Sequence, residues 1–535
     1  MRANDHPAVR FADLTGALCG VAAGGAALAA AQVGGKLVPG AQPPLTVLGD
    51  WVIRITPVSL TEALIRQVGR SDKLVLLICI VVVATVAAAL VGVGYLRGHR
   101  RTALRAIAAL ALLPAAATHG SAGTSVLREL LVLLPAAAVG ALVLSALGQP
   151  LIEAEPPREP PAQQSQVARA AAAEHARLVN GFRLLQRRQV LRAALVLGAA
   201  AAAGTAVVRH LGQPSLALVN RLRVALPAPK NLLPPLSDEF AALGASPLVT
   251  PIESFYWIDT ALSPPQVDPD TWTLTLSRDG AALRTYTYAE LLARATSQAD
   301  ITIGCVSNEI GGDLIGTARW KGVLLADLLR DAGVTRAGRV TGRSVDGFVA
   351  SFPGGLAFDG RPAMVAVGMN GQPLPVLHGF PARLVVPGLY GYTSATKWLE
   401  QIDVSDRTDL PGFWADRGWA PDVRVHLTSR IDTPTDGAAL PAGPARLAGV
   451  AWAPIVGVGL VEVQIDGGAW RPARLSTAVT GVLWRQWVLD WDPTRGSHTV
   501  QVRATDTNGL VQDAERRDVF PSGATGLHRV RVNVR

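Results

Sequence analysis

Cys305 is the side chain in this sequence that is best placed for chemistry. It follows the β-branched alternation of residues 301–303, and a glycine-rich polar turn, residues 307–313, comes directly after it. This pattern presents a thiol at the end of a buried strand, where the thiolate can serve as a metal ligand or a nucleophile. A lone thiol is most often an inert buried residue. Cys19 and Cys79, the other cysteines, lie in apolar runs near the N-terminus, so Cys305 has no disulfide partner in its own domain.

A second group of polar side chains lies further along the chain. His378 and Arg383 flank a Gly-x-Pro turn that enters an apolar strand. Lys397 follows a loop of small residues that includes Ser394 and Thr396. Arginine makes bidentate contacts with oxyanions, lysine supplies a point charge, and small residues expose backbone N–H groups. The combination predicts a phosphate-binding site, although a histidine on its own is usually a core or surface residue.

Short secondary-structure elements must position these two groups. Residues 288–294, just before the strand that leads to the thiol, have the spacing of a short amphipathic helix. Earlier still, an aromatic-rich turn at residues 254–260 leads to a strand at residues 272–276. After the thiol, we expect Trp320 and the leucines between residues 324 and 329 to form the buried side of a helix.

Together the two groups resemble the sulfite oxidase superfamily of molybdenum enzymes. The string from Cys305 to Leu329, CVSNEIGGDLIGTARWKGVLLADLL, resembles the molybdenum-binding segment of that superfamily. The pattern HGxPxRLVxPGxxG…KWL, which begins at His378, resembles its pterin-phosphate site. The resemblance covers residues 252–534. It implies a molybdenum–molybdopterin cofactor (Mo-MPT), with the Cys305 thiolate bound to the metal beside the pterin dithiolene, and soft sulfur ligands suit this metal.

The resemblance also implies roles for single residues. Asn308 would lie near the oxo groups of the metal, and Arg319 would act in the catalytic site, with an Asp313–Arg319 pair that holds the loop together as the alternative. Phe255 is interpreted as a core residue. The cofactor contacts implied by position are Tyr256, Trp257, Ser344, His378, Arg383, Ser394, Thr396 and Lys397. Which of Ser394, Ala395 and Thr396 makes the contact stays open, because this loop is one residue longer than the family pattern.

One departure from the family pattern bears on the substrate. Sulfite oxidases carry arginines just after the Cys-x-x-Asn motif to receive the sulfite anion, whereas this chain has Glu309 and Ile310 there. A carboxylate at that place would repel an anionic substrate unless Arg319 or Arg343 compensates. We therefore expect a small oxyanion or a sulfoxide-type substrate, and the sequence does not assign sulfite.

The N-terminal part of the chain is predicted to lie in a membrane. The mean hydropathy of the 535 residues is +0.28, with 17% charged residues, and the apolar residues are concentrated before about residue 210. A bilayer is crossed by about 20 apolar residues. Five runs are expected to span it, of which the third is the weakest because it is short and holds Pro114. The runs are residues 11–34, 74–96, 104–117, 127–147 and 191–208.

Charges and one motif predict the orientation in the membrane. Basic residues at 97–105 and 183–192 place both loops in the cytoplasm. The first loop, with an amphipathic interfacial piece at 45–69, is also basic and argues against this orientation. Arg187-Arg188, before the last apolar run, resembles a twin-arginine export signal, and pterin–molybdenum proteins cross a membrane already folded. The globular part is therefore expected outside the cytoplasm, anchored in the cell membrane by several spans.

The expected fold has three parts. An all-α transmembrane bundle of about five helices occupies residues 1–210, with a cytoplasmic linker near 148–188, and an α+β molybdopterin domain of the sulfite oxidase type follows at 230–420. At 423–535, short alternating runs between Asp, Gly and Asn turns predict an antiparallel all-β sandwich. The main runs are residues 447–452, 461–465, 484–491 and 498–504. This part resembles the immunoglobulin-like dimerisation domain of the family, which is consistent with a homodimer.

The leading hypothesis is a membrane-anchored oxidoreductase that transfers an oxygen atom to or from a small extracytoplasmic substrate. The sequence has no CxxCH motif and no facing pair of histidines within the apolar runs, so we expect a separate electron carrier, a quinone or a cytochrome. The alternatives are a non-catalytic, membrane-tethered binding or adhesion module, and a transporter; the scarcity of ionisable residues within the runs disfavours the transporter. The net charge of +9 does not indicate nucleic-acid binding, because no Lys/Arg run with interleaved aromatics accompanies it.

Overall fold

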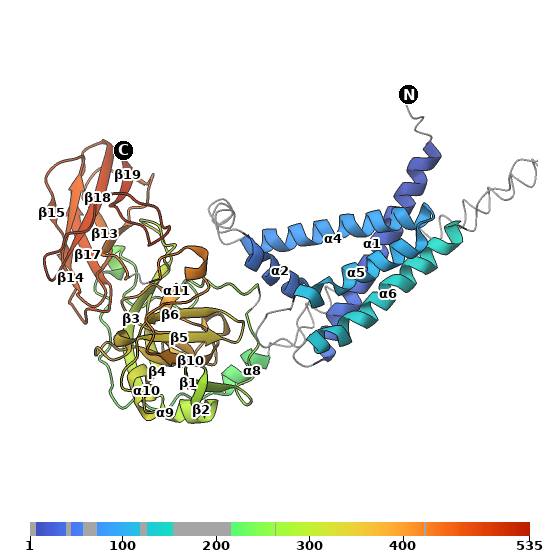
Figure 1. The fold of residues 1–535 in the computed structure, drawn as a ribbon. Coiled ribbons are helices and arrows are strands. Elements are labelled where there is room, and N and C mark those ends of the chain that lie inside the picture. The colour runs from blue at the N-terminus through green and yellow to red at the C-terminus, as the bar shows by residue number, and fades with distance from the viewer. Residues whose placement is uncertain are drawn as a thin grey trace, which may run out of the picture. The chain divides into compact units, whose positions relative to one another are not determined.

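The computed structural model describes residues 7–38, 44–56, 72–117, 126–152, 216–262, 264–421 and 424–535. The chain divides into two compact units (Figure 1). The N-terminal unit comprises Met1–Gln213 with Thr260–Ser263, and the C-terminal unit comprises Pro214–Asp259 with Pro264–Arg535.

The N-terminal unit is helical in the part that the structure describes. Its helices are α1 (Pro7–Leu37), α2 (Pro44–Ile55), α4 (Asp72–Leu96), α5 (Arg100–Ala117) and α6 (Val126–Ile152). Apolar residues run almost without interruption through α1, α4 and α6, and a segment of each is long and apolar enough to cross a membrane. These segments are Asp13–Gly35, Val75–Leu96 and Val126–Gln149.

Small residues let α1 and α4 approach each other closely. A Cβ atom added at Gly20 would overlap the carbonyl oxygen of Ala88, and one added at Gly92 would overlap that of Gly16. Close backbone contact at glycines is a common way for membrane helices to pack. Cys19 belongs to the hydrophobic cluster at this contact, which gives this cysteine a packing role.

The described helices agree with the predicted apolar runs in part. Three of the five predicted runs correspond to the apolar helices: residues 11–34, 74–96 and 127–147. The run at 104–117 lies in α5, which contains Pro114 and is not among the candidate spans. Its first two turns hold three arginines, which lower the mean hydropathy of the helix. Outside the described residues lie the run at 191–208, the linker from residue 153 onward and the Arg187-Arg188 motif.

In the described residues, two sheets and four short α-helices form the α+β part of the C-terminal unit. One sheet has the strand order β2 (Ala281–Thr287), β1 (Thr273–Arg278), β10 (Leu399–Ser405), β5 (Arg339–Ser344) and β6 (Val349–Pro353). The other has the order β3 (Ser297–Gly304), β4 (Ile315–Leu324), β7 (Met364–Met369) and β8 (Gln372–Pro373), with β9 (Arg383–Val385) paired to β7. The helices are α8 (Leu216–Arg223), α9 (Tyr288–Arg294), α10 (Leu325–Asp331) and α11 (Gly391–Ser394).

The hairpin of β3 and β4 positions the thiol. The two strands pair in antiparallel register, with Thr302 opposite Thr317 and Gly304 opposite Ile315. The hydroxyl groups of the two threonines lie 2.5 Å apart in the buried interior. Cys305 follows Gly304 directly, so the strand that the β-branched alternation predicted is confirmed.

Two helix predictions near this hairpin had different outcomes. The helix predicted at 288–294 is confirmed as α9, and Thr287 and Glu290 form a capping box at its N-terminus. The helical placement of Trp320 is wrong. Trp320 is fully buried but lies on β4, whose residues pair with β3 on one side and β7 on the other. These ladder hydrogen bonds extend the strand, and α10 begins only at Leu325.

The remainder of the C-terminal unit, residues 428–534, is called the two-sheet part here (Figure 1, orange to red). One sheet has the order β11 (Thr428–Thr433), β13 (Ala445–Trp452), β17 (Arg485–Trp491) and β16 (Arg474–Leu475). The other has the order β12 (Ala439–Leu440), β19 (His528–Val534), β18 (Gly496–Asp506), β14 (Val458–Ile465) and β15 (Arg471–Pro472). The predicted alternating runs are observed as antiparallel strands, and one hydrophobic cluster draws residues from both sheets, among them Leu447, Trp487, Val461 and Val502.

Candidate cofactor site

The thiol loop, residues 305–314, joins β3 to β4 and is closed by hydrogen bonds of its own. Cys305 N donates to the Leu314 carbonyl at 2.9 Å, and Leu314 N donates to Asn308 Oδ1 at 2.8 Å. A Cβ atom at Gly312 would lie 2.7 Å from Asn308 Oδ1, so glycine is needed to leave room for this amide. The loop therefore presents the thiol on a defined backbone frame.

Cys305 lines a pocket of about 280 Å³, a volume that includes the part open to solvent. Glu309 and Tyr390 also line it, and the two-sheet part contributes Thr428 and Trp452. Among the lining residues in the described part of the chain, Glu309 is the one with a formal charge. The pocket therefore places a carboxylate, and no cationic side chain, on the wall beside the thiol.

Burial controls the protonation of the groups around this pocket. It raises the pKa of the Cys305 thiol, and hydrogen bonds from Ser307 and Val306 oppose the shift. Burial also raises the pKa of the Tyr390 phenol to about 12. Both groups are therefore neutral at pH 7 in the protein alone. A metal cation that binds the sulfur would displace the proton, since thiolate is the metal-binding form.

Arg383, on β9, is a buried cation with no carboxylate in contact among the described residues. Its guanidinium donates to the carbonyl oxygen of His378 at 3.2 Å and to those of Leu384 and Ala395 at 3.4 Å. Its Cζ lies 5.0 Å from the centroid of the Trp320 ring. Burial lowers the pKa of Arg383 to about 10, so it stays charged at neutral pH. A buried charge without a counter-ion is costly, and an anionic ligand would relieve that cost.

Lys397 and His378 lie near Arg383 but differ in charge. Lys397 Nζ forms an ion pair of 2.6 Å with Asp259 Oδ2 and donates to the Leu377 carbonyl at 3.1 Å. Burial, followed by the charges of Arg383 and Lys397, lowers the pKa of His378 to about 3, so the imidazole is neutral. Of the two cations predicted to bind phosphate, Lys397 is thus paired with a carboxylate, whereas Arg383 has no carboxylate in contact among the described residues.

The hydroxyl groups predicted to contact the cofactor also differ in their partners. Ser394 Oγ donates to the Tyr390 carbonyl at 3.1 Å, and Ser344 Oγ accepts from Asp346 N at 3.4 Å. Thr396 Oγ1 is buried without a hydrogen-bond partner in the part of the chain that the structure describes. Unpartnered buried hydroxyl groups are exceptions in native proteins. Between the two hydroxyls left open by the sequence, Thr396 is therefore the better candidate for a ligand contact.

Tyr256 interacts electrostatically with the thiol and with Arg383 of the second polar group, His378, Arg383 and Lys397, which is called the cation group here. Its ring stacks on that of Phe255 with centroids 5.4 Å apart, and Phe255 meets the His378 ring edge to face at 5.5 Å. Phe255 is buried, as predicted. Burial raises the pKa of Tyr256, nearby Cys305 raises it further, and Arg383 lowers it. The phenol therefore lies within electrostatic range of both predicted groups, which the fold brings to one region.

Arg319 and Trp257 differ from the other predicted residues. The Arg319 guanidinium makes two hydrogen bonds of 2.8 Å to the carboxylate of Asp300 across the β3–β4 ladder. Its Nη2 also donates to the carbonyl of Pro234 at 2.8 Å. Arg319 thus has a bidentate structural partner, which is Asp300 and not the Asp313 of the predicted alternative, and it does not line the pocket. Trp257 is 44% exposed.

Two residues of this region, Tyr390 and Asp259, were not predicted as functional. Tyr390 lies on the pocket wall with Cys305, and Asp259 holds Lys397. Both fall within segments that the sequence analysis identified. Their partners, however, are distant in the chain, and the Asp259–Lys397 contact joins residues 138 positions apart. No local spacing could have paired them.

The residues present fit a molybdopterin cofactor. A thiol faces a pocket, a buried guanidinium lacks a carboxylate among the described residues, and a buried hydroxyl lacks a partner there. A Cβ atom at Gly342 would lie 2.6 Å from that hydroxyl, Thr396 Oγ1, so glycine keeps the space beside it clear. These are a soft metal ligand and two groups that an oxyanion would satisfy.

Comparisons with known proteins agree with this donor set. The family model described as oxidoreductase molybdopterin binding domain matches residues 261–414. Sulfite oxidase of Gallus gallus is 32% identical over 324 residues, which cover 51% of this chain and 68% of that protein. Mitochondrial sulfite oxidase of Homo sapiens is 30% identical over 300 residues, which cover 46% of this chain and 54% of that protein. The chain therefore spans about half the length of the human relative.

A solved structure is also similar. It is the sulfane dehydrogenase SoxCD from Paracoccus pantotrophus, at 22% identity and a TM-score of 0.45, covering 54% of this chain and 83% of that chain. The segment matched by the family model, residues 261–414, includes both the thiol loop and the cation group. The chain belongs to the sulfite oxidase family of molybdopterin oxidoreductases, and its cofactor is molybdenum–molybdopterin.

Proposed function

We propose that the chain is a membrane-anchored oxidoreductase that transfers an oxygen atom to or from a small substrate outside the cytoplasm. The observation that carries the proposal is the position of the Cys305 thiol on a pocket wall. Tyr256 is within electrostatic range of this thiol and of the Arg383 guanidinium, which has no carboxylate in contact among the described residues. When bound, the cofactor supplies the two-electron redox chemistry, and the protein binds, orients and encloses the reactants.

The side chains divide this work. Cys305 would be the protein ligand of the metal. Arg383 and Thr396 would hold the pterin phosphate, because each is a buried group that lacks an acceptor or donor of matching strength among the described residues. Lys397 would place a second positive charge near the phosphate while it stays paired with Asp259. The neutral imidazole nearby can donate one hydrogen bond and accept another.

An uncharged sulfoxide-type substrate fits the pocket better than sulfite does. The Glu309 carboxylate is the one formal charge on the described pocket wall. Two like charges 4 Å apart repel by about 1 kcal/mol in water and by more at lower effective dielectric. Of the two arginines considered as compensation, Arg319 is paired with Asp300, and neither Arg319 nor Arg343 is among the residues that line the pocket. The pocket therefore favours a ligand whose oxygen is dipolar and not anionic.

The proposed location rests on the apolar helices and on the sequence. The three helices long enough to cross a membrane support anchoring. The extracytoplasmic orientation rests on the basic residues at 183–192, directly before the last apolar run, and on the twin-arginine pattern. The basic residues at 97–105 do not support it, because 104–117 is not among the candidate spans. The proposal includes a separate electron carrier, a quinone or a cytochrome. We further propose that the two-sheet part is an immunoglobulin-like sandwich used in a homodimer, which its shared hydrophobic core supports.

Elemental analysis of the purified chain tests the proposal. Wild type from a cofactor-competent host is expected to hold about one molybdenum per chain, and Cys305→Ser is expected to abolish activity because oxygen replaces the soft sulfur ligand. Cys79→Ser, a change at the exposed cysteine of α4, is the matched control and should alter neither quantity. Wild-type protein without metal would leave a tethered binding module as the better account.

The same preparation tests the substrate class. With a reduced viologen dye as electron donor, the reaction R2S=O + 2 e⁻ + 2 H⁺ → R2S + H2O should turn over. The kcat/KM for sulfite oxidation with ferricyanide as electron acceptor should be lower than the kcat/KM for sulfoxide reduction. A preference for sulfite would contradict the sulfoxide assignment and leave the oxidoreductase proposal intact.

A further inference from the structure

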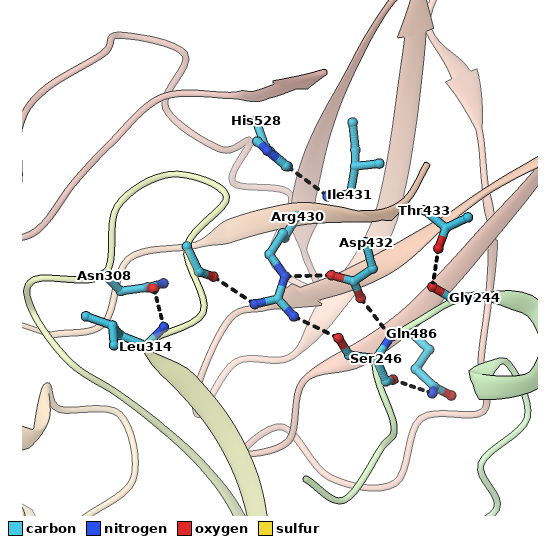
Figure 2. A network of polar contacts seen from close by, with 11 residues as sticks. Gly244, Ser246, Asn308, Leu314, Arg430, Ile431, Asp432, Thr433, Gln486 and His528 are labelled. Carbon is cyan, nitrogen blue, oxygen red and sulfur yellow. Dashed lines mark hydrogen bonds and ion pairs between the residues drawn. The ribbon is translucent and has the colours of Figure 1, made fainter. Parts of the chain in front are cut away.

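Arg430, on β11 of the two-sheet part, lies outside the cofactor site but is bonded to the thiol loop (Figure 2). The side chain is buried. Its Nη1 donates to the carbonyl oxygen of Gly312 at 2.7 Å, and its Nη2 donates to Ser246 Oγ at 2.8 Å. Its Nε donates to Asp432 Oδ1 at 2.6 Å. One guanidinium therefore joins the loop that carries the thiol to β11 and to the segment around Ser246.

The guanidinium is itself held firmly. Asp432 Oδ2 accepts from Ser246 N at 2.7 Å, so the carboxylate links Arg430 to the same segment (Figure 2). Gln486, on β17, donates to the Ser246 carbonyl at 2.8 Å and to Asp238 Oδ1 at 2.6 Å. Because Ser246 and Asp432 are fixed on two sides, Arg430 is restricted to one orientation. A side chain with such support can position the group that it contacts.

A second contact from the two-sheet part lies beside the first. His528, at the start of β19, accepts through Nδ1 from Ile431 N at 2.9 Å (Figure 2). Gly311 has φ +83°, and a Cβ atom there would overlap the His528 ring. The imidazole therefore packs against the backbone of Gly311, next to the Gly312 carbonyl that Arg430 binds. Two successive glycines of the thiol loop thus rest on two strands of the two-sheet part.

The pocket beside Cys305 is bounded by the same two pieces of chain. The thiol loop supplies Asn308 and Glu309, whereas the two-sheet part supplies Thr428 and Trp452. Thr428 stands on β11 two positions before Arg430. The bond from β11 to the loop therefore joins two pieces of chain that both line the pocket, so their separation should affect the width of the pocket.

We propose that Arg430 is a positioning residue, which holds the thiol loop against β11 and thereby sets both the placement of Cys305 and the width of the substrate pocket. This inference deepens the proposed function and rests on it. Arg430 is not among the residues that line the pocket and acts through the Gly312 carbonyl. A hydrogen bond from a charged donor is stronger than a neutral one, so its loss should free the loop locally.

Hydrogen–deuterium exchange of the full-length holoprotein tests the proposal. In Arg430→Ala, the amides of residues 305–314 should exchange about tenfold faster than in wild type, because one charged hydrogen bond restrains the loop. Arg430→Lys should restore part of the protection, since lysine keeps a donor but lacks the fork that reaches three acceptors. The KM for substrate should rise about tenfold in Arg430→Ala, with a smaller change in kcat.

Arg503→Ala is the matched control. Arg503 is an arginine of β18 that pairs with Glu462 at 2.8 Å within the two-sheet part, so its loss should leave exchange in residues 305–314 unchanged. If Arg430→Ala does not accumulate, Arg430→Lys and Ser246→Ala carry the comparison. Unchanged exchange and KM, or an increase spread evenly over the two-sheet part, would overturn the proposal. Wild type that lacks molybdenum would contradict the proposed function alone, because the Arg430–Gly312 bond does not involve the cofactor and the exchange comparison can be made on the cofactor-free chain as well.

Discussion

Arg383 and Lys397 carry the same charge in the same region but have different partners. Lys397 is paired with Asp259 at 2.6 Å, whereas Arg383 meets only backbone carbonyls and aromatic rings among the described residues. Removing one member of a buried pair strands the other charge, but removing a solitary buried charge relieves a cost. The fold without cofactor therefore tolerates Arg383 at the expense of stability.

Arg383→Met is expected to affect protein with and without cofactor in opposite directions. Methionine keeps a long apolar side chain and removes the buried charge, so cofactor-free protein should gain about 1–3 kcal/mol in the free energy of unfolding. The molybdopterin content of protein from a competent host should fall several-fold, because the phosphate loses its unshared cation. Thermal unfolding and the fluorescence of the oxidised pterin measure the two effects. Lower stability of the cofactor-free variant would contradict this account.

At the scale of elements, local patterns predicted what local interactions decide. The strand before Cys305 and the capped helix α9 were both predicted, since alternation and a capping box act within a few residues. Trp320 was wrongly assigned to a helix. Its strand is defined by pairing with β3 and β7, and a local pattern does not show such pairing. The contact of Arg430 with Gly312 joins residues 118 positions apart. No periodicity in one sequence carries information on such a contact.

The candidate site follows the same division between local and distant information. Type and spacing led to the proposal of Cys305, His378, Arg383 and Lys397, which stays a prediction. The preference for Thr396 over Ser394 could not come from the sequence, because it depends on the bond of Ser394 to the Tyr390 carbonyl. The bidentate bond of Arg319 to its cross-strand neighbour on β3 follows from the strand register, which the sequence did not reveal.

A pH-dependent contact joins two elements of the two-sheet part. His498 Nδ1, on β18, lies 2.6 Å from the carboxylate of Asp466, which follows β14. The hydrogen bond to Asp466 raises the pKa of His498. Burial raises the pKa of Asp466, but hydrogen bonds from His498 and Thr499 outweigh it, so that pKa is lowered. The contact is therefore strongest where the histidine is charged and the aspartate is ionised.

Asp466→Asn is expected to lower stability most near pH 5. The stabilisation linked to His498 is fully present below the unfolded histidine pKa of about 6.5 and is lost as pH rises through the higher folded value. The stabilisation linked to Asp466 is present above about pH 3.9 and is lost as pH falls through its lower folded value. Because Asp466 is half exposed, the difference should stay below about 1 kcal/mol.

Thermal unfolding of wild type and Asp466→Asn from pH 4 to 9 measures this difference. Asp490→Asn removes the more exposed pair with Arg446 and serves as the control, because this pair contains no histidine. The prediction requires the stability curves of wild type and Asp466→Asn to converge above the folded pKa of His498. A difference that is constant across this range would assign the effect to packing.

The whole molecule consists of two units that are stabilised in different ways. In the C-terminal unit, hydrogen-bonded side chains such as Arg430 and Gln486 join segments distant in sequence. In the N-terminal unit, glycine contacts such as Gly16 with Gly92 allow helix backbones to approach. In the proposed membrane location, helices have no hydrophobic drive to associate, and such packing would contribute much of the association energy. Because the units are compact by themselves, a change in one is expected to leave the other folded.

Gly92→Ala tests this separation. The added methyl group would overlap the backbone of α1 at Gly16 and Gly20, and overpacking of this kind costs about 1–3 kcal/mol. The loss of helical circular dichroism on heating in detergent should therefore begin at a lower temperature, while the molybdenum content of the chain stays at the wild-type level. Gly94→Ala, two positions along α4, places its methyl group where nothing lies within 4 Å, and should not lower the temperature. If both alanines have the same effect, helix propensity and not the α1–α4 contact determines the stability of this unit.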